Sequence, residues 1–270
     1  MSSGRERGWQ TLTLVLAFAF LYTPIAWIVV FSFIGDPADS SGTQLSLHWY
    51  RALLENEELQ DAAGRSLKLA LMSSPLATLL GTLAGISLAR LERFPGRAAL
   101  IALLAVPIFA PEVLLGFAFL MLFAAFEAAT GLAAGKGMLT LVIAHATLGT
   151  PVVASIVFAR VVDRDQSLEA AARDLGARPL RVLATVTLPL AAPAVLSGWL
   201  LAVTLSFDDV VTSSFLAGPE NTTLPMAIFS GLRLGLDPQI NAVGTILIGA
   251  VSLIIVVSFA AVRLRPRAKA

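Results

Sequence analysis

Long apolar runs separated by short polar segments dominate this chain. A helix needs about 20 mostly apolar residues to span a bilayer. Six runs are long enough, at roughly 11–34, 66–89, 98–126, 138–159, 184–206 and 240–262. The segments between them are too short for a soluble domain, so the pattern predicts an all-α integral membrane protein with six transmembrane helices in a single domain, 1–270. Within the second run, Gly81-x-x-x-Gly85 has a spacing typical of closely packed membrane helices.

The composition agrees with a membrane location. Hydrophobic residues make up 57% of the chain and charged residues 14%, whereas soluble proteins carry about a quarter charged residues. With no cysteine and two histidines, disulfides, iron–sulfur clusters and cysteine zinc sites are excluded, and no metal site is expected. The first apolar run is too long for a cleaved signal peptide and is predicted to be an uncleaved anchor.

The distribution of charge predicts the orientation. Most of the 19 lysines and arginines lie at the two ends of the chain, after the second run and after the fourth. Positive residues favour the cytoplasmic side of a bacterial inner membrane. The segment after the first run is acidic, which fits the outer side. We therefore expect a multi-pass protein of the inner (plasma) membrane with both termini and the segment 161–183 in the cytoplasm.

The segment 161–183 is a polar, alanine-rich interruption between two apolar runs. Alanine favours helix, Gly176 supplies a left-handed helix end, and Pro179 suits the first position of a new helix. The sequence therefore predicts two short helices joined at a glycine elbow along the membrane surface. Two interpretations remain open: an amphipathic connector, or a docking site for a soluble partner.

This segment resembles the ATPase-docking loop of bacterial ABC importer permeases, whose pattern is EAA, three residues, Gly, nine residues and I-x-L-P. Gly176 is followed at the expected offsets by Val186, Leu188 and Pro189. The resemblance implies that docking involves the following residues: Glu169, Ala170, Ala171, Asp174, Gly176, Leu188 and Pro189. The glutamate of the pattern would fall at position 170, and Glu169 lies about 100° away on a helix. We therefore expect the shape of the elbow to matter more than the charge of Glu169.

Glu112 is an ionisable residue at membrane depth, where such residues mark functional sites by default. It lies 15 residues beyond Arg97, about 22 Å along a helix and thus near the middle of the bilayer. Pro107 and Pro111 flank it and would break a regular helix. Glu112 either faces a translocation path or binds a neighbouring helix.

Asp208 and Asp209 end the fifth run in its outer half. Adjacent carboxylates repel one another, and a passing cation would relieve that repulsion, so the pair indicates a cationic cargo. Alternatively, one aspartate caps a helix or pairs with Arg233. His145, in the fourth run, is interpreted as an interhelical hydrogen-bonding residue.

Residues 197–245 resemble the putrescine and spermidine permeases of the type I ABC importers, and the putrescine type most. The matching pieces include Ser206-x-Asp208-Asp209, Gly218-Pro219 and Thr223-Leu224-Pro225. The resemblance implies a permease subunit with a cytoplasmic coupling-helix loop, a second permease, two ATPase copies and a periplasmic polyamine-binding protein. ATP and magnesium would bind the ATPase, with no cofactor on this chain. The chain has no G-x-x-x-x-G-K-[ST] sequence and is not expected to be an enzyme.

Other functions remain possible at this point. ABC permeases for ferric iron or thiamine share the docking loop, although paired aspartates argue against sulfate. A secondary transporter could use Glu112 and the aspartates for ion coupling, but six spans without a convincing repeat disfavour it. An intramembrane enzyme lacks an acid–base or metal motif, and nothing indicates nucleic-acid binding.

Overall fold

The structure, a computed structural model, describes residues 4–35, 45–132, 135–164, 166–234 and 238–264. In these residues the secondary structure is helical, apart from one isolated backbone pairing of Ile34 with Leu45. The chain divides into two compact units, residues 1–60 with 230–270, and residues 61–229. The single transmembrane domain and the cytoplasmic termini stay predictions, and the terminal residues 1–3 and 265–270 lie outside the described part.

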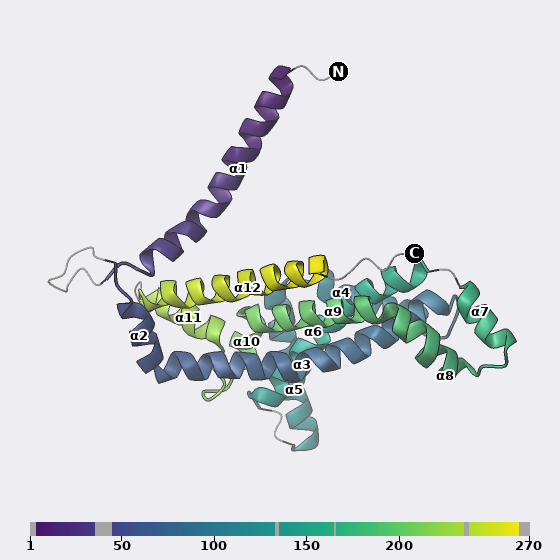
Figure 1. The fold of residues 1–270 in the computed structure, drawn as a ribbon. Helices are drawn as coiled ribbons and strands as arrows, with labels where there is room; N and C mark the ends of the chain where they lie inside the picture. Colours follow the sequence, from purple (N-terminus) through teal and green to yellow (C-terminus); the bar gives the residue numbers. More distant parts are fainter. Residues whose placement is uncertain (1–3, 36–44, 133–134, 165, 235–237, 265–270) are drawn as a thin grey trace. The chain divides into compact units, whose positions relative to one another are not determined.

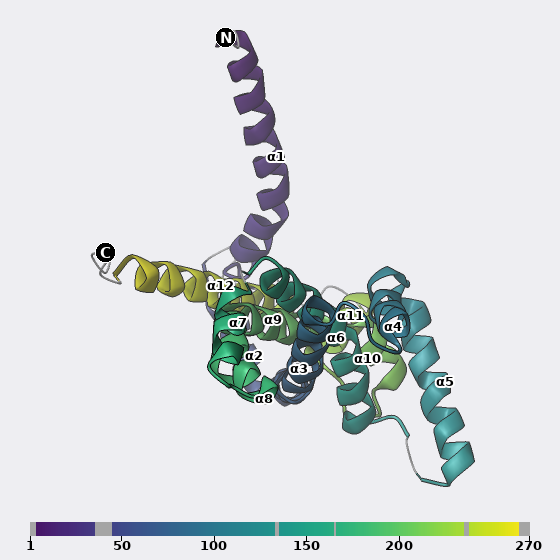
Figure 2. The ribbon, with the colours of Figure 1, turned by 90° about the vertical axis from the view of Figure 1, so that its right-hand side faces the viewer.

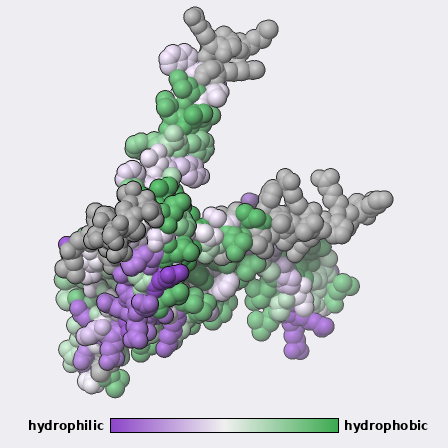
Figure 3. Space-filling view, turned by 60° about the vertical axis from the view of Figure 1, so that its left-hand side comes forward, coloured by the Kyte–Doolittle hydropathy of each residue, from purple (hydrophilic) through white to green (hydrophobic). Residues whose placement is uncertain are grey.

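The first unit contains α1 (Gly4–Phe31), α2 (His48–Glu55) and α12 (Gln239–Leu264). The indole of Trp49 donates a hydrogen bond to the carbonyl of Ile34 (2.6 Å), and the amide of Asn56 donates one to Gln239 (3.0 Å). Much of α1 is exposed and apolar, as the upper part of Figure 3 shows. Contiguous apolar surface of this kind marks contact with lipid or another protein.

Three helices run side by side in the second unit: α3 (Glu57–Arg90), α6 (Met138–Val162) and α9 (Leu188–Asp208) (Figures 1 and 2). A Cβ atom at Gly81 would lie 2.6 Å from Cβ of Val153, and one at Gly85 would lie 2.6 Å from the carbonyl oxygen of Ala154. These glycines therefore let the backbones of α3 and α6 approach closely. The packing predicted from Gly81-x-x-x-Gly85 is confirmed.

The third apolar run is not one helix. It forms α4 (Arg97–Phe109) and α5 (Glu112–Thr130), so the helix break predicted from the prolines is present at Pro111 and absent at Pro107, which lies inside α4. Ala110 is extended (ψ 142°), because a proline disfavours the helical conformation of the residue before it, and Pro111 (ψ 134°) is also outside the helical region. The break places Glu112 at the first position of α5.

The other predicted spans are helices. Five helices are long and apolar enough to cross a membrane, among the described residues, at Trp9–Phe31, Glu57–Arg90, Glu112–Thr130, Met138–Val162 and Pro179–Asp208. The predicted span 240–262 is covered by α12. The all-α membrane class is thus confirmed.

The segment after α9 is folded rather than a simple loop. It contains α10 (Val211–Leu216) and α11 (Leu224–Leu234), and α10 packs against α5 and α6. A Cβ at Gly116 in α5 would lie 2.6 Å from the ring of Phe215, so this glycine lets α10 lie against α5. As a result α10 holds the polar residues that follow α9 beside α6.

Candidate functional site

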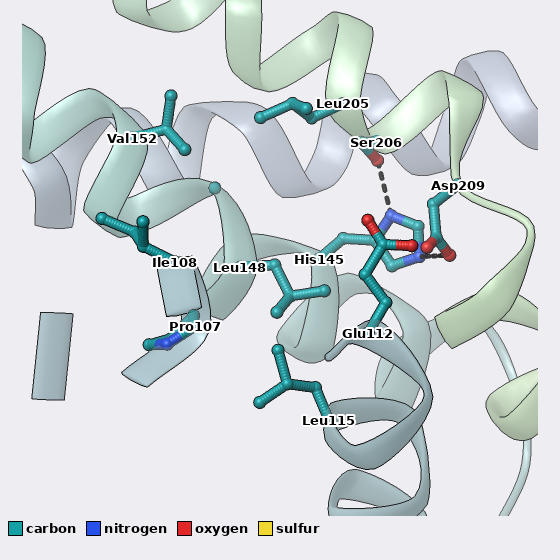
Figure 4. A pocket seen from close by; sticks show the side chains of 11 residues that line it. Pro107, Ile108, Glu112, Leu115, His145, Leu148, Val152, Leu205, Ser206 and Asp209 are labelled. Atoms are coloured by element: carbon teal, nitrogen blue, oxygen red, sulfur yellow. Dashed lines mark hydrogen bonds and ion pairs between the residues drawn. The ribbon is translucent and has the colours of Figure 1, made fainter. Parts of the chain in front are cut away.

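A cavity of about 260 Å³ lies within the second unit, between the α4–α5 break, α6 and the end of α9 (Figure 4). Most of its wall is apolar and includes Leu115, Leu148 and Val152. Its polar lining consists of Glu112, His145, Ser206 and Asp209. We call this cavity the polar pocket. It brings together the ionisable groups that the sequence placed at membrane depth, with the exception of Asp208.

His145 is the centre of a buried hydrogen-bond network in the polar pocket. Its Nδ1 lies 2.9 Å from Oγ of Ser206 in α9, and its Nε2 lies 3.2 Å from Oγ of Ser213 in α10. The same Nε2 lies 3.4 Å from a carboxylate oxygen of Asp209. The imidazole thus joins α6, α9 and α10, and the interpretation of His145 as an interhelical hydrogen-bonding residue is confirmed.

Asp209 follows the last residue of α9 and caps the start of α10. Its carboxylate accepts hydrogen bonds from the backbone N–H groups of Thr212 (3.2 Å) and Ser213 (2.7 Å). Such capping satisfies N–H groups that have no partner within a helix. The alternative in which one aspartate caps a helix is therefore confirmed for Asp209.

Asp208 does not join this arrangement. It is exposed at the end of α9 and is not part of the pocket lining. α9 ends between these two residues, and the expectation that the neighbouring carboxylates together favour a cation stays a prediction. Asp209 adopts an extended conformation (ψ 122°).

Glu112 extends into the pocket from the first turn of α5 (Figure 4). A carboxylate at a helix N-terminus is stabilised by the helix dipole. Within the described residues its carboxylate has neither a hydrogen-bond partner nor an ion-pair partner. The pocket therefore contains one carboxylate held by the fold, Asp209, and one that is available to a ligand, Glu112.

Ser73 links a third long helix to this network. Its hydroxyl lies 2.9 Å from that of Ser206, and both side chains are buried. The sequence contained a partial signal, because Ser206 and Asp209 are only three residues apart at the end of the fifth apolar run. Ser73 and Ser213 were missed because nothing local distinguishes them from other serines in membrane helices.

The docking segment consists of α7 (Ser167–Asp174) and α8 (Pro179–Val182), at one end of α3 and α9 (Figure 1). Gly176 has a φ of +84° and ends α7, with bonds from Gly176 N–H to Arg173 O (2.8 Å) and from Ala177 N–H to Ala172 O (3.0 Å). This is the Schellman helix end that favours glycine. The predicted elbow at Gly176 and the helix start at Pro179 are confirmed.

The second short helix differs from the prediction. It continues through a π-helical turn, η1 (Leu183–Thr187), into α9 instead of ending on the membrane surface. Pro189 explains the wide turn. Its ring would crowd the preceding turn of a regular α-helix, and it has no N–H to bond there. Movement of α8 is therefore directly coupled to α9.

Glu169 is the one predicted docking residue that the fold encloses. It is only 4% exposed and interacts with Arg90, Thr187 and Arg173. The remaining six are exposed: Ala170, Ala171, Asp174, Gly176, Leu188 and Pro189. The carboxylate of Glu169 contacts other parts of this chain in place of facing outward, and the expectation that the shape of the elbow matters more for docking than this charge stays a prediction. Sequence reasoning also missed three leucines that are exposed around the elbow: Leu168, Leu175 and Leu180.

Comparison with known proteins identifies relatives along nearly the whole chain. The putrescine transport system permease protein PotI of Escherichia coli K12 is 42% identical over 246 residues, covering 91% of this chain and 88% of PotI. The spermidine/putrescine transport system permease protein PotC of Haemophilus influenzae is 38% identical, with 90% of this chain and 91% of PotC covered.

Solved structures share the fold. One is a bacterial ABC transporter involved in the import of the polysaccharide alginate, with a TM-score of 0.68, 17% identity and coverage of 98% of this chain and 99% of that one. Another is the inward-facing methionine transporter MetNI, with a TM-score of 0.59, 16% identity and coverage of 76% and 94%. The ABC importer permease fold expected from the sequence is thereby confirmed.

The family assignment follows from residues 77–269, which match the family described as binding-protein-dependent transport system inner membrane component. Members are non-catalytic, multi-pass subunits of the inner membrane and work with a binding protein and an ATPase, so the predicted class and location are confirmed. On the family match and the relatives together, this chain belongs to the inner membrane permease components of binding-protein-dependent ABC transport systems.

Proposed function

We propose that the chain is a permease subunit of an ATP-driven importer that carries polyamines into the cytoplasm, with putrescine as the first candidate and spermidine as the second. The observation that carries this proposal is the polar pocket with two carboxylates, Glu112 and Asp209, and no lysine or arginine among its described lining residues. The names of the relatives PotI and PotC support the same cargo class.

The pocket suits the chemistry of a short diamine. Ammonium groups form strong hydrogen bonds with carboxylates. We assign one ammonium group to Glu112, which has no other partner among the described residues, and assign the apolar wall at Leu148 and Val152 to the methylene chain. Asp209 adds negative potential from a fixed position. Asp208, exposed at the end of α9, would attract the cation outside the pocket.

The proposed assembly contains a second permease, two ATPase copies and a periplasmic polyamine-binding protein. ATP and magnesium would bind the ATPases. The exposed leucines around Gly176 give the docking segment an apolar surface within a polar surround, as is usual for the centre of a protein interface. Exposed Ala170, Ala171 and Asp174 would contribute to the same interface, together with Leu188 and Pro189.

Reconstitution of the complete transporter in proteoliposomes tests the cargo. Vesicles would contain ATP, with binding protein and labelled putrescine or spermidine outside. Loss of one hydrogen bond to a charged group costs about 1.5–3 kcal/mol, equivalent to a roughly 10- to 100-fold loss in affinity. We expect Glu112→Gln to lower putrescine uptake by about this factor at subsaturating putrescine. Glu127→Gln is the matched control, because Glu127 lies on the same helix outside the polar pocket.

Three results would contradict the proposal. Normal uptake by the Asp208→Asn/Asp209→Asn double variant would refute the claim that these carboxylates lie on the path of the cation. ATP-driven uptake of ferric iron or thiamine without polyamine uptake would assign a different cargo. Uptake by this chain alone, driven by an ion gradient without ATP, would indicate a secondary transporter.

A further inference from the structure

We propose that Arg90, Glu169 and Thr187 form a latch that ties the docking segment to α3 and α9 and carries its movement to the polar pocket. They are positioning residues, since none of them lines that pocket. The inference rests on the proposed docking of an ATPase at this segment. It adds the path by which movement caused by the ATPase reaches the polar pocket.

The latch has a well-defined geometry around one carboxylate oxygen. Oε1 of Glu169 in α7 accepts hydrogen bonds from Nε of Arg90 (3.0 Å) and from the hydroxyl of Thr187 (3.0 Å), and Nη2 of Arg90 lies 2.9 Å away. Arg90 is the last residue of α3, and Thr187 is the last residue of η1 before α9 begins. One side chain of the docking segment thus binds the ends of two long helices.

Burial makes this contact different from a surface ion pair. The Glu169 side chain is 6% exposed and that of Arg90 13% exposed. A buried carboxylate is stable only while its partners remain in place, because an unpaired buried charge is strongly unfavourable. Arg173 also approaches Glu169, but at 3.8 Å and from an exposed side chain, so it is a weak substitute. The docking segment therefore cannot leave α3 or α9 without breaking the latch.

Both tethered helices lead to the polar pocket. Ser73 lies 17 residues before Arg90 in α3, and Ser206 lies 19 residues after Thr187, mostly along α9. At 1.5 Å per residue these distances are about 26 Å and about 28 Å. The hydroxyls of Ser73 and Ser206 are hydrogen-bonded to each other, and Ser206 contacts His145. A shift of the docking segment is therefore transmitted along two long helices, each with one internal proline, that meet at the pocket network.

The ratio of putrescine imported to ATP hydrolysed, in the complete reconstituted transporter, tests the latch. Thr187→Val removes the hydroxyl donor while keeping the side-chain shape. Thr185→Val is its matched control, because Thr185 is exposed in the same turn and its hydroxyl donates to the carbonyl of Arg181 in its own helix. Arg90→Gln is paired with Arg93→Gln, an exposed arginine just beyond the end of α3.

We expect the latch variants to retain the ATPase on purification and to hydrolyse ATP, but to import about tenfold less putrescine per ATP, as for loss of one hydrogen bond to a charged group. The controls should keep the wild-type ratio. The exchanged pair Arg90→Glu/Glu169→Arg should recover a higher ratio than either single change, which a purely structural role at each position would not produce.

The outcomes separate this inference from the proposed function. Absence of putrescine uptake by the wild type would overturn the proposed function and the coupling role with it. Normal wild-type uptake with an unchanged ratio in Thr187→Val and Arg90→Gln would overturn the latch alone. If Arg90→Gln does not accumulate in the membrane, the isosteric Thr187→Val and its control decide the question.

Discussion

Replacement of Gly81 by alanine tests whether close helix contact holds the second unit together. The new Cβ would lie 2.6 Å from Cβ of Val153 and 2.7 Å from the carbonyl oxygen of Thr150. Carbon atoms normally approach to about 3.5–4.0 Å. Because a backbone oxygen in α6 is one of the two obstacles, rotation of a side chain cannot relieve the clash. α3 and α6 must instead move apart by roughly 1 Å.

The expected cost follows from this overpacking. Extra methylene groups in a well-packed core typically cost about 1–3 kcal/mol. Alanine also stabilises a helix by up to about 1 kcal/mol relative to glycine. The measured change in the free energy of unfolding of Gly81→Ala is therefore smaller than the cost of the clash itself. Gly64→Ala isolates the propensity term, since Gly64 is in the same helix and a Cβ there meets nothing within 4 Å. The two variants should therefore differ by about 1–3 kcal/mol.

Thermal unfolding of the purified chain in detergent micelles measures the difference. For a protein of this size 1 kcal/mol corresponds to about 2–4 °C in Tm, so Gly81→Ala should melt about 2–12 °C below Gly64→Ala. A Tm for Gly81→Ala equal to or above that of Gly64→Ala would refute the claim that α3 and α6 are in backbone contact at this position.

Three further predictions concern the docking elbow and the polar pocket. Gly176→Val should abolish uptake while the protein still inserts in the membrane. A side chain at φ +84° strains the backbone of the elbow by about 1–2 kcal/mol, although there is space for the side chain itself. Uptake equal to that of the wild type would contradict this prediction. His145→Leu should lower the free energy of unfolding by about 1–3 kcal/mol by leaving buried polar partners unsatisfied, and an unchanged Tm would exclude the network. Asp209→Asn should reduce putrescine uptake into vesicles more than Asp208→Asn does, since Asp209 lines the pocket and Asp208 does not. A larger reduction in Asp208→Asn would indicate that the cation passes Asp208 instead.

The helical framework could be predicted from the sequence because a membrane helix is defined by local properties. The length of each apolar run, the glycine spacing at Gly81 and the elbow at Gly176 all act within a few residues. The break between α4 and α5 could be predicted only in part from the sequence. A proline in a membrane helix can kink it or end it, depending on whether neighbouring helices and side chains satisfy the freed backbone groups. Here Pro107 remains inside α4, while Pro111 lies between two helices.

The polar pocket could also be predicted only in part from the sequence. Glu112 and Asp209 are notable in the sequence because carboxylates are rare at membrane depth. Their different states depend on tertiary structure: Asp209 is held by α10 and His145, and Glu112 is not held. His145 lies 61 residues from Ser206, and no local pattern connects them. The sequence could name the ionisable residues, but not which carboxylate remains available to a cation.

Glu169 makes contacts within the fold that the motif did not predict. Its displacement from the motif position by one residue suggested a weakened docking charge, whereas the fold turns that side chain inward onto Arg90 and Thr187. Contact with the proposed ATPase is then left to exposed groups such as Leu175, which is 90% exposed. A change at Glu169 should consequently impair coupling while the ATPase stays bound, and a polar change at Leu175 should release the ATPase. Co-purification of the ATPase with Glu169→Gln and Leu175→Asn distinguishes the two roles, and loss of the ATPase only from Glu169→Gln would return this glutamate to the interface.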